Sequence, residues 1–209
     1  MPFPARNHNS DQIALSIFNA LVAYGIPRGG NGRRFICAVT TGNPLIGAGE
    51  IYVATSGHAA GQLSNALATH AALTQDFIYT VAPIINADNL VNPLVGGAFH
   101  LPRPAGPYGL NNPPYGINGG RFCAEPKALI AAANSAYRIS AMSTIWYGNS
   151  DNPYPDPANQ TPDPTGHNTT GLFAVPCLVC RTNERYISMR ESQDRNRARG
   201  ANFFMEAPF

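Results

Sequence analysis

Three cysteines and one glutamate in the second half of the chain have the types and spacing of a metal-dependent catalytic site. Cys123-Ala-Glu125 precedes one expected helix, and Pro176-Cys177-Leu-Val-Cys180 opens another. Three thiolates can bind Zn²⁺ and leave the fourth tetrahedral position for water, which is typical of a catalytic zinc site. Both motifs stand at helix N-termini, where the helix dipole and unpaired N–H groups favour thiolate over thiol. Glu125 can then lie beside the water without binding the metal.

The cysteines are also compatible with sites that have no catalytic metal. An isolated Cys177-x-x-Cys180 pair is typical of a structural zinc knuckle or a redox pair as well. A closed zinc site would need a fourth ligand from Cys37 or a histidine. Cys37 lies in an expected strand among apolar neighbours, which favours a buried free thiol, and the five histidines show no ligand spacing. The pattern therefore favours an open site.

The segments around these motifs alternate between helical and extended patterns. Apolar residues recur at helical spacing early in the chain, where Asn9 or Ser10 is the expected N-cap. Two apolar runs separated by a Gly-rich turn predict a hairpin. The expected helices are 11–26, 59–80, 126–139 and 176–191. The expected strands are 34–41, 50–55 and 143–147, with 201–205 as a candidate for a short additional strand. Residues 83–120 and 149–172 show no period and predict two long loop insertions.

Composition indicates one domain, 1–209, with a weakly charged surface. Only 12% of the 209 residues are charged, and the net charge is +2. No apolar run approaches the 18 or so residues of a membrane helix, and the N-terminus has no signal-peptide pattern. We therefore expect action in the cytoplasm, with delivery as an effector as one route, and no membrane partner.

The two motifs together resemble the zinc-dependent cytidine deaminase superfamily, in particular the deaminase domains of bacterial toxins and effectors and the AID/APOBEC-like enzymes. The signature is Cys123-Ala-Glu125 followed by Pro176-Cys177-x-x-Cys180. The element order agrees with the family over most of 10–190, and insertion 149–172 explains a long gap between the motifs. The resemblance implies an α/β fold, a three-layer α/β/α sandwich with a central mixed sheet of four or five strands.

The resemblance also implies a mechanism and a set of site residues. Zn²⁺, bound by the three cysteines, lowers the pKa of water toward about 7. The resulting hydroxide attacks C4 of cytosine or C6 of adenine, while Glu125 moves the protons. A cation near the thiolates would offset their charge, and Arg121, Lys127 or Arg181 could supply it. The substrate-binding candidates are Asn43, at the end of the first strand, Ala124, within the metal motif, Tyr115, as a stacking aromatic, and His58, as a pocket group.

The basic residues favour a nucleic-acid substrate. Thirteen of the fourteen are arginine, and six of these lie between 181 and 199. Arginine pairs well with phosphate and stacks on bases. We therefore expect a toxin-like cytosine deaminase, active in nucleic-acid editing on DNA more than RNA, with an immunity protein as a further partner. The alternatives are a free cytidine or nucleotide deaminase, although Pro126 replaces the arginine usual there, and a non-catalytic binding module of the same fold.

Overall fold

The computed structural model describes residues 3–44, 47–57, 59–74, 78–82, 90–91, 98–99, 123–132, 135–176 and 180. Helices and strands alternate along these residues, largely in the expected order. The elements are α1 (His8–Ala23), η1 (Gly30–Gly32), β1 (Arg34–Asn43), β2 (Ala48–Thr55), α2 (Ala60–Thr74), β3 (Tyr79–Val81), β4 (Leu90–Val91), β5 (Ala98–Phe99), α3 (Ala124–Ala132), β6 (Ile139–Tyr147) and β7 (Phe173–Ala174). Among the helices so described, none has the length and apolar character needed to cross a membrane.

Five strands form one mixed sheet in the order β3-β2-β1-β6-β7. The central strand β1 pairs antiparallel with β2 across the hairpin and antiparallel with β6 on its other edge. β2 and β3 are parallel, β6 and β7 are antiparallel, and β4 and β5 form a separate two-stranded ribbon. The mixed sheet agrees with the predicted number of strands, but β3 and β7 are unexpected members. The expected strand 201–205 lies outside the described residues.

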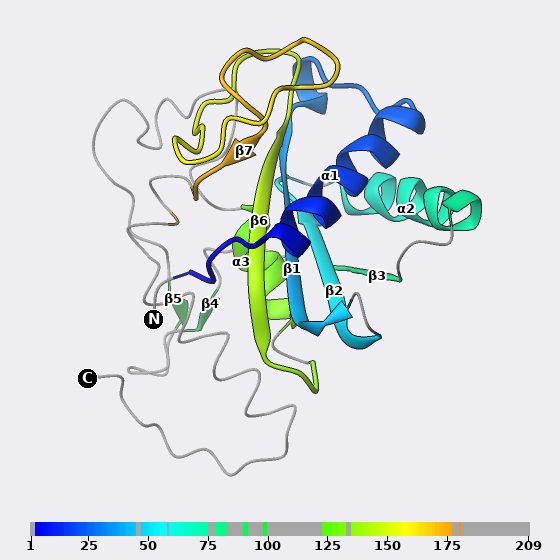
Figure 1. Cartoon of the computed structure of the whole chain (residues 1–209), viewed down its shortest axis with the longest axis vertical. Helices are drawn as coiled ribbons and strands as arrows, with labels where there is room; N and C mark the ends of the chain where they lie inside the picture. The colour runs from blue at the N-terminus through cyan, green and yellow to red at the C-terminus, as the bar shows by residue number, and fades with distance from the viewer. Residues whose placement is uncertain are drawn as a thin grey trace.

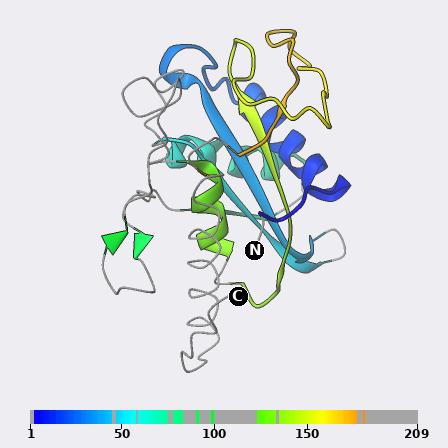
Figure 2. The same ribbon diagram turned by 90° about the vertical axis from the view of Figure 1, so that its left-hand side faces the viewer.

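The sheet is buried on both faces, so the described part of the chain is an α/β fold with three layers. Along β1, Phe35, Cys37 and Val39 pack on the face covered by α3, whereas Ile36 and Ala38 pack on the face covered by α1 and α2. Figures 1 and 2 show α3 on one side of the sheet and α1 and α2 on the other. Because neither face of β1 meets water, its sequence is an almost continuous apolar run.

Helix α1 begins earlier than predicted, and its N-cap is Asn7 rather than Asn9 or Ser10. The Asn7 side chain accepts a hydrogen bond from the Ser10 N–H at 2.9 Å, and the Ser10 hydroxyl oxygen accepts one from the Asn7 N–H at 3.1 Å. This reciprocal pair is a capping box. The prediction placed the cap beside the first apolar residues, but the first turn of the helix is polar. Gly25, with a φ of 77°, follows the C-terminal end.

Two expected helices end early because the following residues pair with the sheet. The helix expected over 59–80 ends at Thr74, and Tyr79–Val81 forms β3 beside β2. The helix expected over 126–139 is Ala124–Ala132, and the strand expected from 143 already begins at Ile139. Alanine-rich sequence favours helix locally, but pairing with a neighbouring strand overrides that preference.

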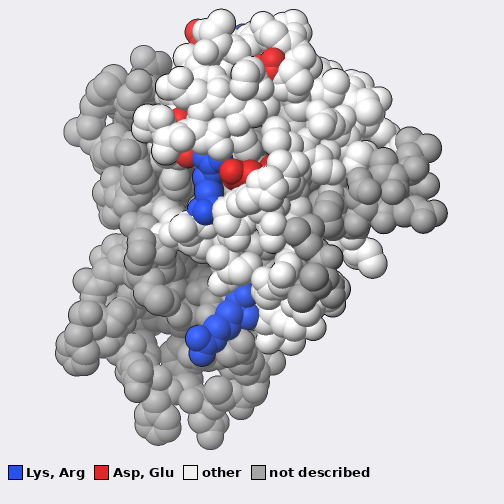
Figure 3. Space-filling view, in the orientation of Figure 1, with Lys and Arg blue, Asp and Glu red and all other residues white. Residues whose placement is uncertain are grey.

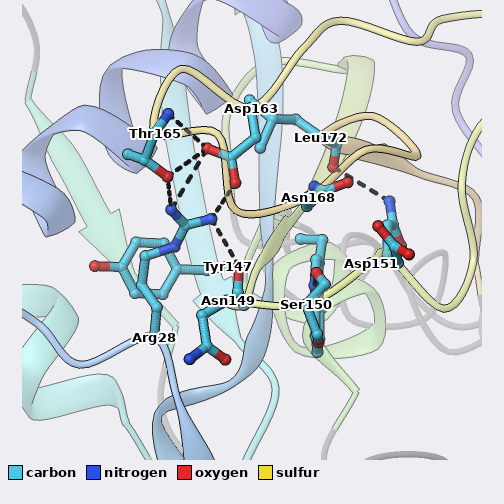
Figure 4. A network of polar contacts seen from close by, with 12 residues as sticks. Arg28, Tyr147, Asn149, Ser150, Asp151, Asp163, Thr165, Asn168 and Leu172 are labelled. Carbon is cyan, nitrogen blue, oxygen red and sulfur yellow. Dashed lines mark hydrogen bonds and ion pairs between the residues drawn. The ribbon is translucent and has the colours of Figure 1, made fainter.

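Loop 149–172 contains no helix or strand and is ordered by side-chain hydrogen bonds. A series of Asx turns shapes it, in each of which a side-chain oxygen accepts from the backbone N–H two residues later. The accepting residues are Asn152, Asp156, Asn159, Asp163 and Asn168. Figure 4 shows Arg28 facing the Asp163 carboxylate, with Tyr147 beside it. The expected loop is thus confirmed, and its Asn and Asp residues determine its shape.

Candidate metal centre

Cys123, Glu125 and Cys180 come together in a buried cluster. Cys123 immediately precedes α3, Glu125 lies in its first turn, and Cys180 is helical and follows β7 in the chain. One ligand atom from each residue lies within 4.8 Å of the other two, and all three residues are buried. Two sulfurs bound to one zinc at about 2.3 Å would be roughly 3.8 Å apart in tetrahedral geometry. The two thiols and the carboxyl therefore fit a small thiolate-bound metal ion.

The sequence of α3 explains how Cys123 reaches the sheet. Ala124 and Ala128 are fully buried, and side chains this small let the helix lie close to the strands. Pro126 stands in the first turn, where its missing N–H group costs nothing, because the first N–H groups of a helix have no partner within it. The helix can therefore start directly after Cys123, with its N-terminus on the cluster.

A buried cation accompanies the cluster. Lys127 is only 3% exposed, and its Nζ donates a hydrogen bond to the Gly57 carbonyl oxygen at 2.7 Å. Burial lowers the pKa of Lys127 to about 8, although the charges of Cys123 and Glu125 act in the opposite direction. Of the three cations proposed from sequence, Lys127 is thus placed within electrostatic reach of the cluster. Arg121 and Arg181 lie outside the described residues.

Cys37 is a buried free thiol, as predicted. It is fully buried in β1, and burial together with the nearby charge of Glu125 raises its pKa well above the usual value of a thiol. A raised pKa disfavours the thiolate form that binds metal ions. Among the described residues, the metal-binding cluster does not include Cys37. The structure therefore gives no support to a closed site with Cys37 as fourth ligand.

A small pocket lies beside the cluster and includes two of its members. Its walls come from the start of β1, the end of β2, the N-terminus of α3, loop 149–172 and the residue after β7. The lining residues are Phe35, Ser56, Cys123, Ala124, Glu125, Tyr154 and Val175. Ala124, a predicted substrate-binding residue, is thus part of the pocket wall. The arrangement places the Glu125 carboxyl and the Cys123 thiol next to a mostly apolar recess.

The structure places Asn43 at the opposite end of β1 from this pocket, and its predicted substrate-binding role stays a prediction. Asn43 is exposed at the last position of β1, whereas Phe35 lines the pocket near the first. Eight residues at about 3.3 Å each separate them by about 26 Å. The C-terminal end of α3 lies near Asn43's end of the sheet, because Ser135 Oγ is 2.9 Å from Thr41 Oγ1. The cluster is at the opposite end of the helix.

The remaining predicted site residues fall outside the part of the chain that the structure describes. They are His58, Tyr115 and Cys177, together with the arginines between 181 and 199. Their predicted roles stay predictions.

Sequence reasoning missed four pocket residues, namely Phe35, Ser56, Tyr154 and Val175. The two-residue period of β1 could have identified Phe35, because it places Phe35 on the same face as Cys37. Tyr154 had no local signal, since it belongs to a loop whose path depends on contacts distant in the sequence.

On the described surface seen in Figure 3, the blue atoms of basic residues are separated by uncharged surface and form no single patch. Arg6 pairs with Asp11 and Asp156, and Arg28 pairs with Asp163. These two arginines therefore hold the fold together. The predicted phosphate-binding role of arginine rests on residues outside the described part.

Comparison with protein-family models, with curated proteins and with solved structures gives no match for this chain. The residues and geometry of the site itself are therefore the basis for assigning a function.

Proposed function

We propose that the protein is a zinc-dependent hydrolytic deaminase of the cytidine-deaminase type, acting on cytosine in a polynucleotide. The observation that carries this proposal is the buried Cys123–Glu125–Cys180 cluster at the edge of a pocket. A mixed five-stranded sheet with helices on both faces supports it, because the resemblance implies such a sandwich. A toxin-like or effector-like biological role goes with this assignment.

In the proposed site, Cys123, Cys177 and Cys180 hold the zinc ion. When bound, zinc activates water as a nucleophile at neutral pH. Three thiolates and one Zn²⁺ would together carry a net negative charge. The positive charge of Lys127 would offset it. Its Nζ is held by the Gly57 carbonyl, so this charge stays in place beside the ligands.

Glu125 is the proposed proton carrier. It is 4% exposed and lines the pocket, so its carboxyl group is shielded from bulk water. In the proposed reaction it takes a proton from the attacking water, delivers it to the ring nitrogen next to C4, and then passes a proton to the departing amine. A C4–O bond forms and the C4–N bond to the exocyclic amine breaks. Cytosine and water give uracil and ammonia.

The test of this function is uracil formation by the purified protein from single-stranded DNA, duplex DNA, RNA and free cytidine. We expect activity on a polynucleotide, with binding that weakens as salt rises, because phosphate contacts release counterions. Turnover of free cytidine alone, insensitive to salt, would support the alternative nucleoside deaminase. Absence of uracil from all four would leave a non-catalytic binding module as the better assignment.

The Glu125→Gln variant tests the mechanism. It should lose about 10²–10⁴-fold in activity, the usual contribution of a general acid–base, and keep its zinc content and melting temperature. Glu50→Gln is the matched control, because Glu50 lies in β2 outside the pocket and accepts a hydrogen bond from the Tyr52 hydroxyl at 2.7 Å. Full activity in Glu125→Gln would contradict the assignment.

A further inference from the structure

One side of the pocket is aromatic and is supported from behind by the core. Phe35 and Tyr154 both line the pocket, with ring centroids 5.8 Å apart and planes inclined by 40°. Trp146, which is fully buried, packs against Phe35 with ring centroids 4.8 Å apart. A planar nitrogen heterocycle stacks favourably on such faces. Tyr154 is half-buried, so part of its surface remains accessible to a ligand.

The backbone around Tyr154 is fixed to the sheet by hydrogen bonds. The Val175 N–H donates to the Tyr154 carbonyl at 3.0 Å, and the Asp156 N–H donates to the Phe173 carbonyl at 2.9 Å. Pro155 forms a bridge with Ala174 between them. Residues 154–156 therefore continue the sheet beyond β7, and Tyr154 takes its place from that pairing.

Side chains hold the same segment from two further directions. Asn152 accepts from the Tyr154 N–H at 3.0 Å and donates its Nδ2 to the Phe173 carbonyl at 3.0 Å. Arg6 pairs with Asp156 and lies 4.0 Å from the centre of the Phe173 ring. The position of Tyr154 is thus set by contacts with the sheet edge, with Asn152 and, through Asp156, with Arg6.

We propose that Tyr154, which loop 149–172 supplies to this pocket, contacts the planar base of the substrate. The inference rests on the proposed function, because that function identifies the pocket ligand as a nucleobase. A side chain held in place before the ligand arrives contributes more to affinity than one that must be ordered by it. Sequence reasoning had assigned such a stacking role to Tyr115, which lies outside the described residues, so Tyr154 is an additional stacking aromatic.

The experiment measures equilibrium binding in a Glu125→Gln background, which stops turnover. The probe is a fluorescent single-stranded DNA with one cytosine, and free cytidine serves as a competitor. Tyr154→Ala should raise the Kd for the oligonucleotide about tenfold, the usual loss for one base–aromatic stack. Tyr154→Leu, which fills the space without a ring, should weaken binding similarly, and Tyr154→Phe should restore it to within about twofold.

Tyr24→Ala is the matched control, since Tyr24 is 44% exposed at the end of α1 and does not line the pocket. It should bind like the parent protein. Zinc content and melting temperature, measured for every variant, separate loss of a contact from loss of the fold. In active protein, Tyr154→Leu should raise KM more than it lowers kcat.

Each outcome separates this inference from the function it rests on. Unchanged Kd in Tyr154→Ala or Tyr154→Leu, in a protein that forms uracil, would overturn the role of Tyr154 alone. Binding that depends on the Tyr154 ring, in a protein that forms no uracil from any substrate, would overturn the proposed function alone. No binding of DNA, RNA or cytidine would overturn both.

Discussion

The two faces of the sheet bury side chains of different kinds. The face under α1 and α2 holds large apolar residues that are fully buried, among them Ile17, Phe18 and Leu21. The face under α3 also holds large residues, such as Trp146, but around the cluster it is built from alanines, cysteines and the buried ionisable residues Glu125 and Lys127. A buried charge costs free energy, whereas a buried large apolar side chain contributes about 1.5–3 kcal/mol.

The difference indicates that the α1 and α2 face mainly stabilises the fold, whereas the α3 face holds the residues of the proposed metal site. The buried charges near α3 are tolerable because the opposite face supplies apolar burial. Changes on the α1 and α2 face should therefore alter the free energy of unfolding with little effect on the metal site. Changes at the α3 cluster should remove metal and activity.

Removing a metal ligand should have the largest effect. Cys180→Ala is expected to lower the zinc content of the purified protein from about one ion per chain to almost none, and to abolish deamination. The change should also destabilise the protein, because metal-binding energy is part of the folding energy. Metal analysis by mass spectrometry measures the loss directly.

Cys37→Ala is the matched control on the same face. Cys37 is a buried cysteine outside the cluster, so this variant should keep its zinc and lose only packing. Equal zinc content in Cys180→Ala and Cys37→Ala would remove the distinction between the two faces.

A cavity on the α1 and α2 face should give the largest loss of stability without loss of metal. Phe18 is fully buried, and its ring contacts Tyr147 edge-on at a centroid distance of 5.5 Å. Phe18→Ala is expected to lower the free energy of unfolding by about 3–5 kcal/mol, measured by urea denaturation. Val22→Ala, on the same helix but 37% exposed, should change it little. Loss of zinc from folded Phe18→Ala would show that the two faces are coupled.

The Arg28–Asp163 pair should have a smaller effect that depends on pH. The Asp163 side chain is fully buried, and its carboxylate lies 2.5 Å from Arg28. Burial by itself raises the pKa of Asp163, but hydrogen bonds from Arg28 and Thr165 outweigh it and lower the pKa. A lowered folded pKa stabilises the protein above the unfolded value of about 3.9, and this stabilisation is lost as pH falls through the folded value.

Asp163→Asn should therefore destabilise the protein by about 1–3 kcal/mol at pH 7, and its difference from wild type should shrink below about pH 4. Urea denaturation at several pH values measures both. Gln160→Ala, a change at an exposed and uncharged position of the same loop, is the control. A constant difference between Asp163→Asn and wild type across this range would show that the ion pair does not stabilise the loop.

The N-cap of α1 should give the smallest measurable effect. Asn7→Ala removes the side-chain acceptor of the capping box and should cost about 1 kcal/mol in unfolding free energy. Asn9→Ala, at the position favoured from sequence, should cost clearly less. A larger loss of unfolding free energy in Asn9→Ala than in Asn7→Ala would support Asn9, one of the two predicted residues, as the N-cap.

The sequence predicted features that depend on local pattern and on chemically distinctive residues. The apolar run of β1, the hairpin to β2 and the partnership of Cys123 with Cys180 all followed from residue type and spacing. Features set by contacts between distant residues did not follow. The parallel pairing of Tyr79–Val81 and the place of Tyr154 both depend on partners that local pattern does not reveal.

The position of Asn43 relative to the pocket is a feature of the same kind. A strand has two ends, and only the direction of α3 across the sheet decides which end meets the metal cluster. Lys127 was one of three candidate cations because all three stand near the motifs in sequence. Its burial against Gly57 became visible only in the fold.

The position of β1 in the middle of the sheet also has a consequence for how the chain folds in the cell. Its partner β2 follows at once, but its other partner β6 arrives about one hundred residues later, as in the pairing of Thr40 with Ala141. At about 5–20 residues per second, ribosomal synthesis leaves that edge of β1 unpaired for about 5–20 s. An apolar strand with an open edge is a template for pairing with other chains. Aggregation during synthesis should therefore depend on how quickly residues 139–147 emerge, and a chaperone acting in that interval would protect the nascent hairpin.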